Sequence, residues 1–265
     1  MPIRLTLPPT FRDRIADADR PQMGMWVCSG SPLVAEICAG AGLDWLLIDG
    51  EHSPIGLETT SALLQAVAPY PVTPLVRAPS DDAVVLKQLL DLGAQNVLVP
   101  MIDTAEQARA VVSAVRYPPR GVRGVGSALS RGARWNRVEG YMADADQYVS
   151  LFVQVESATG VKNAAAIAAV DGVDGVFVGP SDLAASLGVL GQQTHPDVTA
   201  AVRATFEAVR AAGKPVGVNA FDPSVAQAYL DAGASFVLVG ADVAMLARGS
   251  EALADRWIDD EAAGE

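Results

Sequence analysis

One alternation runs through most of the chain and limits the folds open to it. Short apolar runs rich in β-branched residues alternate with longer Ala- and Leu-rich segments of helical period, and Gly, Pro and Asp join them. Several helical segments end in Ala-Gly or Leu-Gly, as helices with a glycine C-cap do. Eight strands alternating with helices in about 250 residues predict an α/β fold, the (β/α)8 TIM barrel. The expected strands are residues 23–27, 45–49, 73–78, 96–102, 151–156, 175–180, 215–220 and 236–241.

The main rival is a doubly wound open sheet, which shows the same alternation. That fold usually carries a glycine-rich phosphate-binding turn after its first strand, and no such turn follows residues 23–27. We expect a single barrel domain over residues 1–257 and an acidic tail over residues 258–265. Residues 118–149 are the one long polar departure from the alternation, and a loop of that length is usually functional or packed on a partner.

Charge and hydropathy exclude several classes of partner. The formal net charge of −12 argues against nucleic acid or an anionic membrane. No apolar run approaches the roughly 20 residues that a membrane span needs, and residues 1–20 lack the apolar core of a signal peptide. The two cysteines, Cys28 and Cys38, are expected to be free thiols in a reducing cytoplasm, because a chain of this length needs no disulfide staple.

The second expected strand runs directly into the sequence Asp-Gly-Glu-His. Three ionisable side chains in four positions at the end of a buried strand indicate a site rather than a simple turn. In barrel enzymes the active site lies at the C-terminal ends of the strands, so the residues at these ends should meet. They are Asp49, Glu51, His52, Arg77, Met101, Asp103, Gln154, Glu156, Ser181, Asp182 and Asn219.

Four of these residues carry a specific expectation. A lone histidine is more often a packing residue, but His52 follows two acids at a barrel mouth, which favours function. Arg77 follows an apolar run, so its charge must point inward or be paired. Glu156 and Asp182 each precede a helical segment and fit a helix cap, yet together on neighbouring strands they would repel unless a cation lay between them. Two carboxylates suit Mg²⁺ or Mn²⁺, and no zinc-like histidine spacing competes.

A combination of motifs is distributed along the chain in a fixed order: LLIDGEHSP, LVPMID, RYPPRGVRGVG, ARWNR, VQVES and GVFVGPSDLAASLG. Together they resemble the HpcH/HpaI class II aldolase family, over about residues 20–257. The resemblance implies a barrel of the phosphoenolpyruvate/pyruvate type, with an exchanged C-terminal helix that packs the chains into homo-oligomers, a hexamer in this family. It implies a carbon-carbon lyase that cleaves 4-hydroxy-2-oxo acids to pyruvate and an aldehyde, with Mg²⁺, Mn²⁺ or Co²⁺ as cofactor.

The resemblance also assigns roles to residues of the expected site. It implies that Glu156 and Asp182 bind the metal, and that Gln154, Ser181 and Asp182 contact pyruvate. It implies further that His52 is the catalytic base and that Arg77 stabilises the transition state.

The resemblance gives Asp91 the role of raising the basicity of His52. Asp91 lies near the C-terminal end of the expected helix 81–94, which should be at the opposite end of the barrel from the strand-end residues. Our hypothesis is therefore that Asp91 reaches His52 from a neighbouring subunit. On the residues alone, Asp91 is a surface acid.

Lysine usage and three rivals complete the sequence argument. None of the three lysines, Lys87, Lys162 and Lys214, stands at the C-terminal end of a strand, which argues against a Schiff-base aldolase. A CoA-ester lyase would need a basic cluster for the CoA phosphates, and none is evident. An oxaloacetate decarboxylase would share the enolate chemistry, and a non-catalytic scaffold would be expected to lose residues at the barrel mouth. The acceptor aldehyde is expected near residues 187–197 and 217–222, where we read His195 as a helix-entry residue.

Overall fold

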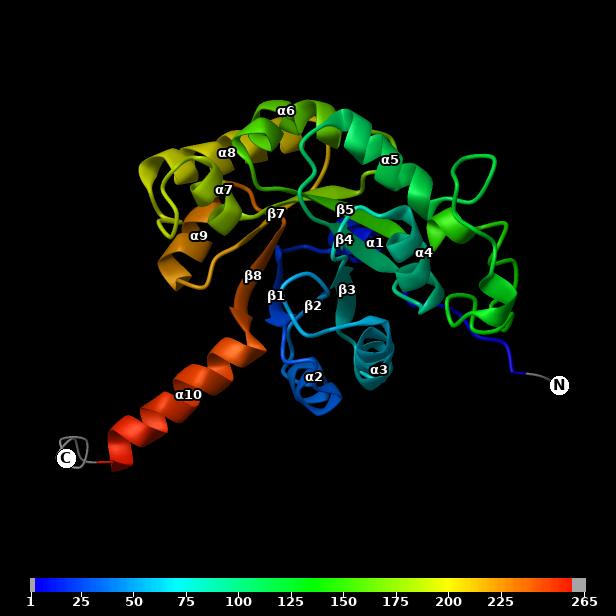
Figure 1. The fold of residues 1–265 in the computed structure, drawn as a ribbon, viewed down its shortest axis with the longest axis horizontal. Helices are drawn as coiled ribbons and strands as arrows, with labels where there is room; N and C mark the ends of the chain where they lie inside the picture. The colour runs from blue at the N-terminus through cyan, green and yellow to red at the C-terminus, as the bar shows by residue number, and fades with distance from the viewer. Residues whose placement is uncertain (1–2, 259–265) are drawn as a thin grey trace.

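The computed structural model describes residues 3–258, and eight parallel strands in it close into one barrel in the order β1 to β8 (Figure 1). The strands are Gln22–Val27 (β1), Trp45–Asp49 (β2), Thr73–Arg77 (β3), Asn96–Val99 (β4), Ser150–Val155 (β5), Gly175–Val178 (β6), Val216–Asn219 (β7) and Phe236–Ala241 (β8). Each expected strand is present, and β8 pairs with β1. The prediction of a closed barrel is confirmed, and the open sheet is excluded.

Helices follow the strands, and all of them except the last, α10, lie around the barrel. They are Pro32–Ala39 (α2), Leu57–Val67 (α3), Ala83–Asp91 (α4), Ala105–Val115 (α5), Ala158–Ala168 (α6), Pro180–Ser186 (α7), Pro196–Ala211 (α8), Pro223–Asp231 (α9) and Asp242–Trp257 (α10). Side-chain oxygens cap several N-termini, for example Ser157 at α6 and Asp222 at α9. These caps fix where each helix leaves the mouth of the barrel, and so they fix the positions of the loops that carry the site.

Aromatic side chains fill the barrel interior near its N-terminal end. Trp45, Phe152 and Phe236 are fully buried there. A Cβ on Gly24 would lie 2.5 Å from the Trp45 ring, and a Cβ on Gly217 would lie 2.2 Å from the Phe236 ring. Glycine at these two positions therefore leaves the space that the large rings occupy.

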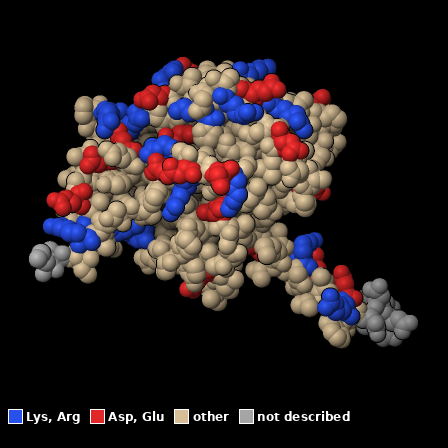
Figure 2. All heavy atoms as spheres, turned by 180° about the vertical axis from the view of Figure 1, so that it is seen from behind, with Lys and Arg blue, Asp and Glu red and all other residues tan. Residues whose placement is uncertain are grey.

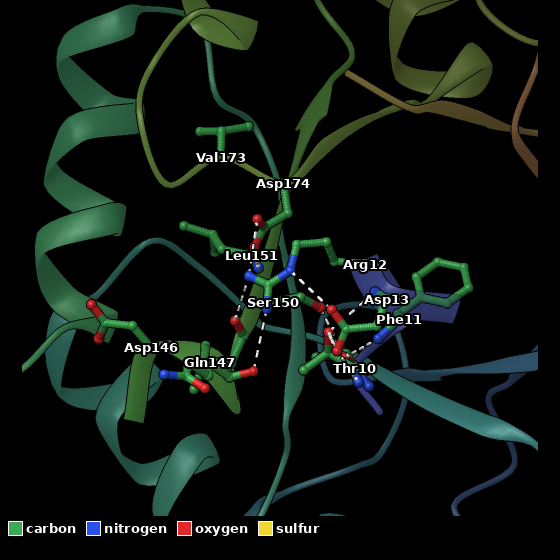
Figure 3. A network of polar contacts seen from close by, with 12 residues as sticks. Thr10, Phe11, Arg12, Asp13, Asp146, Gln147, Ser150, Leu151, Val173 and Asp174 are labelled. Atoms are coloured by element: carbon green, nitrogen blue, oxygen red, sulfur yellow. Dashed lines mark hydrogen bonds and ion pairs between the residues drawn. The ribbon is translucent and has the colours of Figure 1, made fainter. Parts of the chain in front are cut away.

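A short helix that the sequence did not predict, Phe11–Asp17 (α1), closes this end of the barrel. Phe11 packs against Trp45 with 5.0 Å between ring centroids, and its backbone N–H donates to Asn96 Oδ1 at 2.7 Å. Arg12 pairs with Asp174 at 3.3 Å and donates to the carbonyl groups of residues 147 and 149 (Figure 3). Seven residues are too few for a helical period to stand out, and tertiary contacts hold this helix in place.

The long segment 118–149 forms a small satellite of its own beside α4 and α5 (Figure 1). It contains two 3-10 turns, Ser127–Leu129 (η1) and Ala145–Gln147 (η2). Val138 and Tyr141 pack there with Leu7 of the N-terminal segment. The departure from the alternation in the sequence thus corresponds to an ordered appendage with its own apolar cluster.

The last helix, α10, extends away from the barrel (Figures 1 and 2). Asp242 is its only buried residue, while Leu246, Leu253 and Trp257 are exposed. Among the described residues, no helix is both long and apolar enough to cross a membrane. The expected acidic tail 258–265 lies, apart from Ile258, outside the described residues.

Candidate active site

A cavity of about 430 Å³ opens at the C-terminal ends of the strands. Of the seven residues to which the resemblance assigns a role, five line it, namely His52, Arg77, Gln154, Ser181 and Asp182. These residues come from β2, β3, β5 and β6 or from the loops that follow them, so the barrel gathers side chains that are far apart in the sequence. Its position at the C-terminal mouth is where barrel enzymes carry their active sites.

Asp49 organises the loop that leaves β2. Its Oδ1 accepts the backbone N–H groups of Glu51 at 3.0 Å and His52 at 3.3 Å, and its Oδ2 accepts the hydroxyl of Ser53 at 3.1 Å. Asp49 is only 2% exposed. The acids of the Asp-Gly-Glu-His stretch thus have different tasks, because Asp49 shapes the loop that presents the other side chains to the cavity.

Arg77 is held in one orientation by two carboxylates and an indole ring. Its Nε donates to Asp49 Oδ1 at 2.9 Å, and its Nη1 lies 2.8 Å from Glu51 Oε2. The guanidinium carbon lies 4.5 Å from the centroid of the Trp26 ring. Arg77 is 5% exposed, so its charge is paired as the sequence required and its planar face is fixed beside the cavity.

Glu156 is buried beside Gln154 and Gly179, two residues that line the cavity. Its Oε1 accepts the backbone N–H of Met101 at 2.8 Å, and Gln154 Nε2 donates to its Oε2. A Cβ on Gly179 would lie 2.5 Å from Glu156 Oε2 and 2.9 Å from Gln154 Nε2, so only glycine leaves room for these two side chains. Burial raises the pKa of Glu156 to about 7, and the nearby charges of Asp182 and Glu51 also raise it.

Glu156 and Asp182 together fit a divalent cation that takes oxygen ligands. The negative charges of Glu156 and Asp182 repel each other. A positive charge between them would offset both this repulsion and the cost of burying the Glu156 carboxylate. Among residues 3–258 no three His, Cys, Asp or Glu side chains cluster to hold a metal by themselves. Two carboxylates would thus leave the remaining positions of an octahedral ion such as Mg²⁺ to substrate and water. Gln154 Oε1 adds a buried oxygen that has no hydrogen-bond partner in the described part of the chain.

His52 stands at the rim of the cavity rather than on its floor. Its side chain is 66% exposed in this single chain, and its Nε2 lies 3.8 Å from Glu51 Oε2. Its backbone N–H donates to Asp49, which anchors the residue while the ring stays accessible to a substrate in the cavity.

Asp91 does not share this cavity. It is the last residue of α4, at the end of the barrel where β4 begins, while His52 follows the end of β2 at the opposite side. Within the chain its Oδ1 lies 3.3 Å from Nη2 of Arg123, a fully buried arginine of the 118–149 segment. The expected position of Asp91, at the opposite end of the barrel from the strand-end residues, is therefore confirmed. Its pairing with His52 stays a prediction about two chains.

The structure also shows which of the candidate residues cap helices. Ser157, not Glu156, caps α6, and Asp182 lies in the first turn of α7 without a capping bond. His195 caps α8 by accepting the N–H of Asp197 at 3.2 Å, so our reading of it as a helix-entry residue is confirmed.

The cavity also contains residues to which the sequence argument gave no role. Trp26, Cys28, Phe177 and Tyr229 line it, and Asn219 bonds to Trp26 within it. Cys28 and Cys38 are free and partly buried, as expected, but Cys28 faces the site. An alternation of apolar residues cannot distinguish a ring in the core from a ring at the mouth, so these positions carried no signal.

Comparison with known proteins identifies the family. The profile of the HpcH/HpaI aldolase/citrate lyase family matches residues 22–249, which is most of the chain. The chain belongs to this family.

Relatives in the family share nearly its whole length. The chain is 52% identical over 262 residues to a hydroxypyruvate/pyruvate aldolase of Deinococcus radiodurans, an alignment that covers 98% of this chain and 94% of the relative. It is 49% identical over 247 residues to a 4-hydroxy-2-oxo-heptane-1,7-dioate aldolase of Salmonella heidelberg, covering 93% and 94%. The crystal structure of a family member from Burkholderia cenocepacia superimposes with a TM-score of 0.89 at 40% identity, covering 92% and 97%. These likenesses confirm the resemblance seen in the motifs.

Proposed function

We propose that the protein is a class II aldolase, a carbon-carbon lyase that reversibly cleaves 4-hydroxy-2-oxo acids to pyruvate and an aldehyde with the help of a divalent metal. The observation that carries the proposal is the cavity that Arg77, fixed by two carboxylates, shares with Asp182, next to the buried acid Glu156. Relatives at about half identity over nearly the whole chain bear the names of such aldolases.

Arg77 stabilises the charge that the reaction develops. When the bond between C3 and C4 breaks, its electrons move toward the keto oxygen at C2 and pyruvate leaves as its enolate. A guanidinium that Asp49, Glu51 and Trp26 already hold in place needs no reorganisation as this charge appears. It therefore binds the transition state more strongly than the uncharged keto group.

Glu156 and Asp182 would hold the metal, and Gln154 and Ser181 would contact the 2-oxo acid. A bound Mg²⁺, Mn²⁺ or Co²⁺ would polarise the keto group and offset the charge of the two acids. Ser181 Oγ accepts a hydrogen bond from Gln193 at 2.8 Å, so its own hydroxyl proton remains available to the substrate.

His52 moves the proton. Cleavage requires that the hydroxyl at C4 lose its proton as the C4 carbonyl forms, and the exposed imidazole at the rim can accept that proton. In the reverse reaction the same proton returns to the alkoxide when the enolate adds to the aldehyde. No lysine is among the described residues that line the cavity, so nothing there supports a Schiff-base route.

Exchange of the pyruvate methyl protons with deuterated solvent tests this function without knowledge of the aldehyde. We expect exchange with Mg²⁺, Mn²⁺ or Co²⁺, loss of exchange after chelation, and recovery on addition of metal. Exchange at an unchanged rate in metal-free protein, or a pyruvate adduct trapped by borohydride, contradicts the proposal. A CoA-ester lyase would instead require CoA esters for cleavage.

The oligomer is part of the proposal. The apolar side chains of α10, including Met245, Leu246 and Trp257, are exposed in the single chain, and so are Leu33 and Ile37 on α2, the helix beside its base. We propose that α10 packs on a neighbouring copy, as the resemblance implies. In such an assembly Asp91 of one chain would approach His52 of another.

A further inference from the structure

Asn219 ends β7 with its side chain in the cavity. β7 lies next to β6, the strand that leads to Ser181 and Asp182, so the amide belongs to the same pocket as the proposed metal site. Its Oδ1 accepts the indole N–H of Trp26 at 2.7 Å. This bond connects the end of β7 to the ring on which Arg77 rests.

The bond to Trp26 fixes which way the Asn219 amide faces. An indole nitrogen can donate a hydrogen bond but cannot accept one, so the atom that faces Trp26 must be the amide oxygen. The amide nitrogen is therefore turned to the other side. Among residues 3–258 no contact of this NH2 group with an acceptor accompanies the Trp26 bond. Asn219 thus offers donors to whatever occupies the cavity.

The surroundings of Trp26 make this arrangement rigid. The guanidinium carbon of Arg77 lies 4.5 Å from the centroid of the Trp26 ring. The Phe177 ring packs edge to face with Trp26, at an interplanar angle of 85°. Three contacts from three strands hold the indole, so the amide bonded to it has little freedom to turn. A donor in a fixed place discriminates between substrates better than a mobile one.

Trp26, which bonds to Asn219, Phe177, which packs against Trp26, and Ala220 form an apolar part of the cavity wall beside Asn219. A substrate hydroxyl placed against such a wall would lose water without gaining a partner, which is unfavourable. The amide of Asn219 supplies the missing partner. A substrate that lacks the hydroxyl leaves the amide itself unpaired.

We propose that Asn219 is a specificity-determining residue that selects substrates with a hydroxyl oxygen near the bond formed or broken. This inference rests on the proposed aldolase function and extends it to a substrate class. Two sources share the chemistry: a hydroxyl on C3 of the 2-oxo acid, as in hydroxypyruvate, and a hydroxyl on the aldehyde, as in glycolaldehyde. The Deinococcus radiodurans relative is named for hydroxypyruvate as well as pyruvate.

Three variants separate the roles of the Asn219 amide and of the Trp26 indole N–H. Asn219→Leu removes both the donor and the acceptor of the amide at similar volume. Asn219→Asp keeps an oxygen for Trp26 Nε1 but replaces the donor with an acceptor. Trp26→Phe keeps the amide and the aromatic ring but removes the N–H that orients it. Thermal unfolding of each variant reports whether the fold is retained.

The readout is a ratio of kcat/KM values measured with the Mn²⁺-loaded protein. One arm compares hydroxypyruvate with pyruvate at a fixed aldehyde, and the other compares glycolaldehyde with acetaldehyde at a fixed 2-oxo acid. We expect the preference for the hydroxylated partner to fall about tenfold in both Asn219 variants, as for a lost hydrogen bond, and to fall less in Trp26→Phe. The arm that changes identifies which partner carries the hydroxyl. Ratios that equal those of the wild type in both arms overturn the inference. An equal fall in kcat/KM for hydroxylated and plain substrates gives such an unchanged ratio.

Calorimetric titration of hydroxypyruvate and pyruvate into the same Mn²⁺-loaded proteins keeps this test independent of turnover. A wild-type protein that exchanges no pyruvate protons and cleaves no 4-hydroxy-2-oxo acid would defeat the proposed function. The affinity ratio would then still decide the role of Asn219, by falling or staying constant in Asn219→Leu and Asn219→Asp. Failure of the Asn219 inference would show as a constant ratio in an active aldolase.

Discussion

Asp49 and Arg77 are paired residues at the ends of the neighbouring strands β2 and β3, and their side chains meet at the mouth of the barrel. Nε and Nη2 of Arg77 lie 2.9 and 2.8 Å from Oδ1 of Asp49. Parallel pairing places the two residues side by side, so the strand ends themselves assemble the pair. The same Asp49 oxygen also accepts the N–H of His52. One carboxylate thus links the orientation of the proposed charge stabiliser to the position of the proposed base.

Arg77→Lys is expected to reduce kcat about 10²- to 10³-fold, the range for loss of a placed donor in an oxyanion site. Lysine keeps the charge, but a single ammonium cannot reach Asp49 and Glu51 together and stack on Trp26. Steady-state kinetics of 4-hydroxy-2-oxo acid cleavage measure the effect, and Arg109→Lys, at an exposed pair with Glu106, is the matched control. Near wild-type turnover in Arg77→Lys would show that the planar fork is unnecessary.

Gly179→Ala is expected to weaken metal binding severely while the barrel still folds. The new Cβ would lie 2.5 Å from Glu156 Oε2 and 2.9 Å from Gln154 Nε2, so both side chains must move. Gly240→Ala is a suitable control, because no atom lies within 4 Å of a Cβ there. Calorimetric titration with Mn²⁺ compares the two variants. Equal affinity for Mn²⁺ in both would separate Glu156 from the metal site.

The pKa of Glu156 predicts how the metal-free protein responds to pH. Burial raises this pKa from 4.5 to about 7, so the folded state favours the protonated acid. Its contribution to stability is complete below pH 4.5 and is lost as pH rises through about 7. The difference between a pKa of 4.5 and one of about 7 corresponds to roughly 3 kcal/mol.

Glu156→Gln imitates the protonated acid and should remove this part of the pH dependence. Without metal, the variant is expected to unfold at higher urea concentration than the wild type at pH 8, and the difference should shrink toward pH 5. Glu207→Gln, at an exposed position of α8, is the control. Parallel pH profiles of wild type and Glu156→Gln would contradict the raised pKa.

Much of the site could be predicted because it lies at strand ends. The apolar alternation gave the strands, the barrel placed their ends together, and Arg77, Gln154, Ser181 and Asp182 were found there. The capping of α6 by Ser157 and the Cβ-free space at Gly179 could not be predicted, because both depend on atoms brought together by the fold. Asp91 came from family resemblance alone. Within the chain it contacts Arg123, in a segment where the alternation of strands and helices gives no guidance.

Removal of α10 is expected to reduce the oligomer while leaving the barrel folded. Leu246, Leu253 and Trp257 are exposed in the single chain, so the helix contributes little to its own barrel. Light scattering after size exclusion measures the mass of a chain that ends after residue 244. Met245→Glu together with Leu246→Glu tests the same surface without shortening the chain. An unchanged mass in both would show that other surfaces form the oligomer.

The pairing of His52 with Asp91 is expected to form between chains. The two residues stand at opposite ends of one barrel, yet the exposed ring of His52 can accept a partner from outside its own chain. A carboxylate that accepts the Nδ1–H would fix the tautomer of the imidazole and stabilise its protonated form. His52→Ala and Asp91→Ala should each be nearly inactive, and mixing them after dissociation and reassembly should restore activity at about a quarter of the sites under random assortment.

Asp91 also faces Arg123, so urea unfolding of Asp91→Ala must accompany the assay. Arg123→Met is the control, because it removes the contact between Asp91 and Arg123 without changing Asp91. If the site is shared between chains, activity returns in the mixture although the stability loss of Asp91→Ala persists. A mixture as inactive as its parents, with both parents folded and reassembled, would assign Asp91 to Arg123 alone.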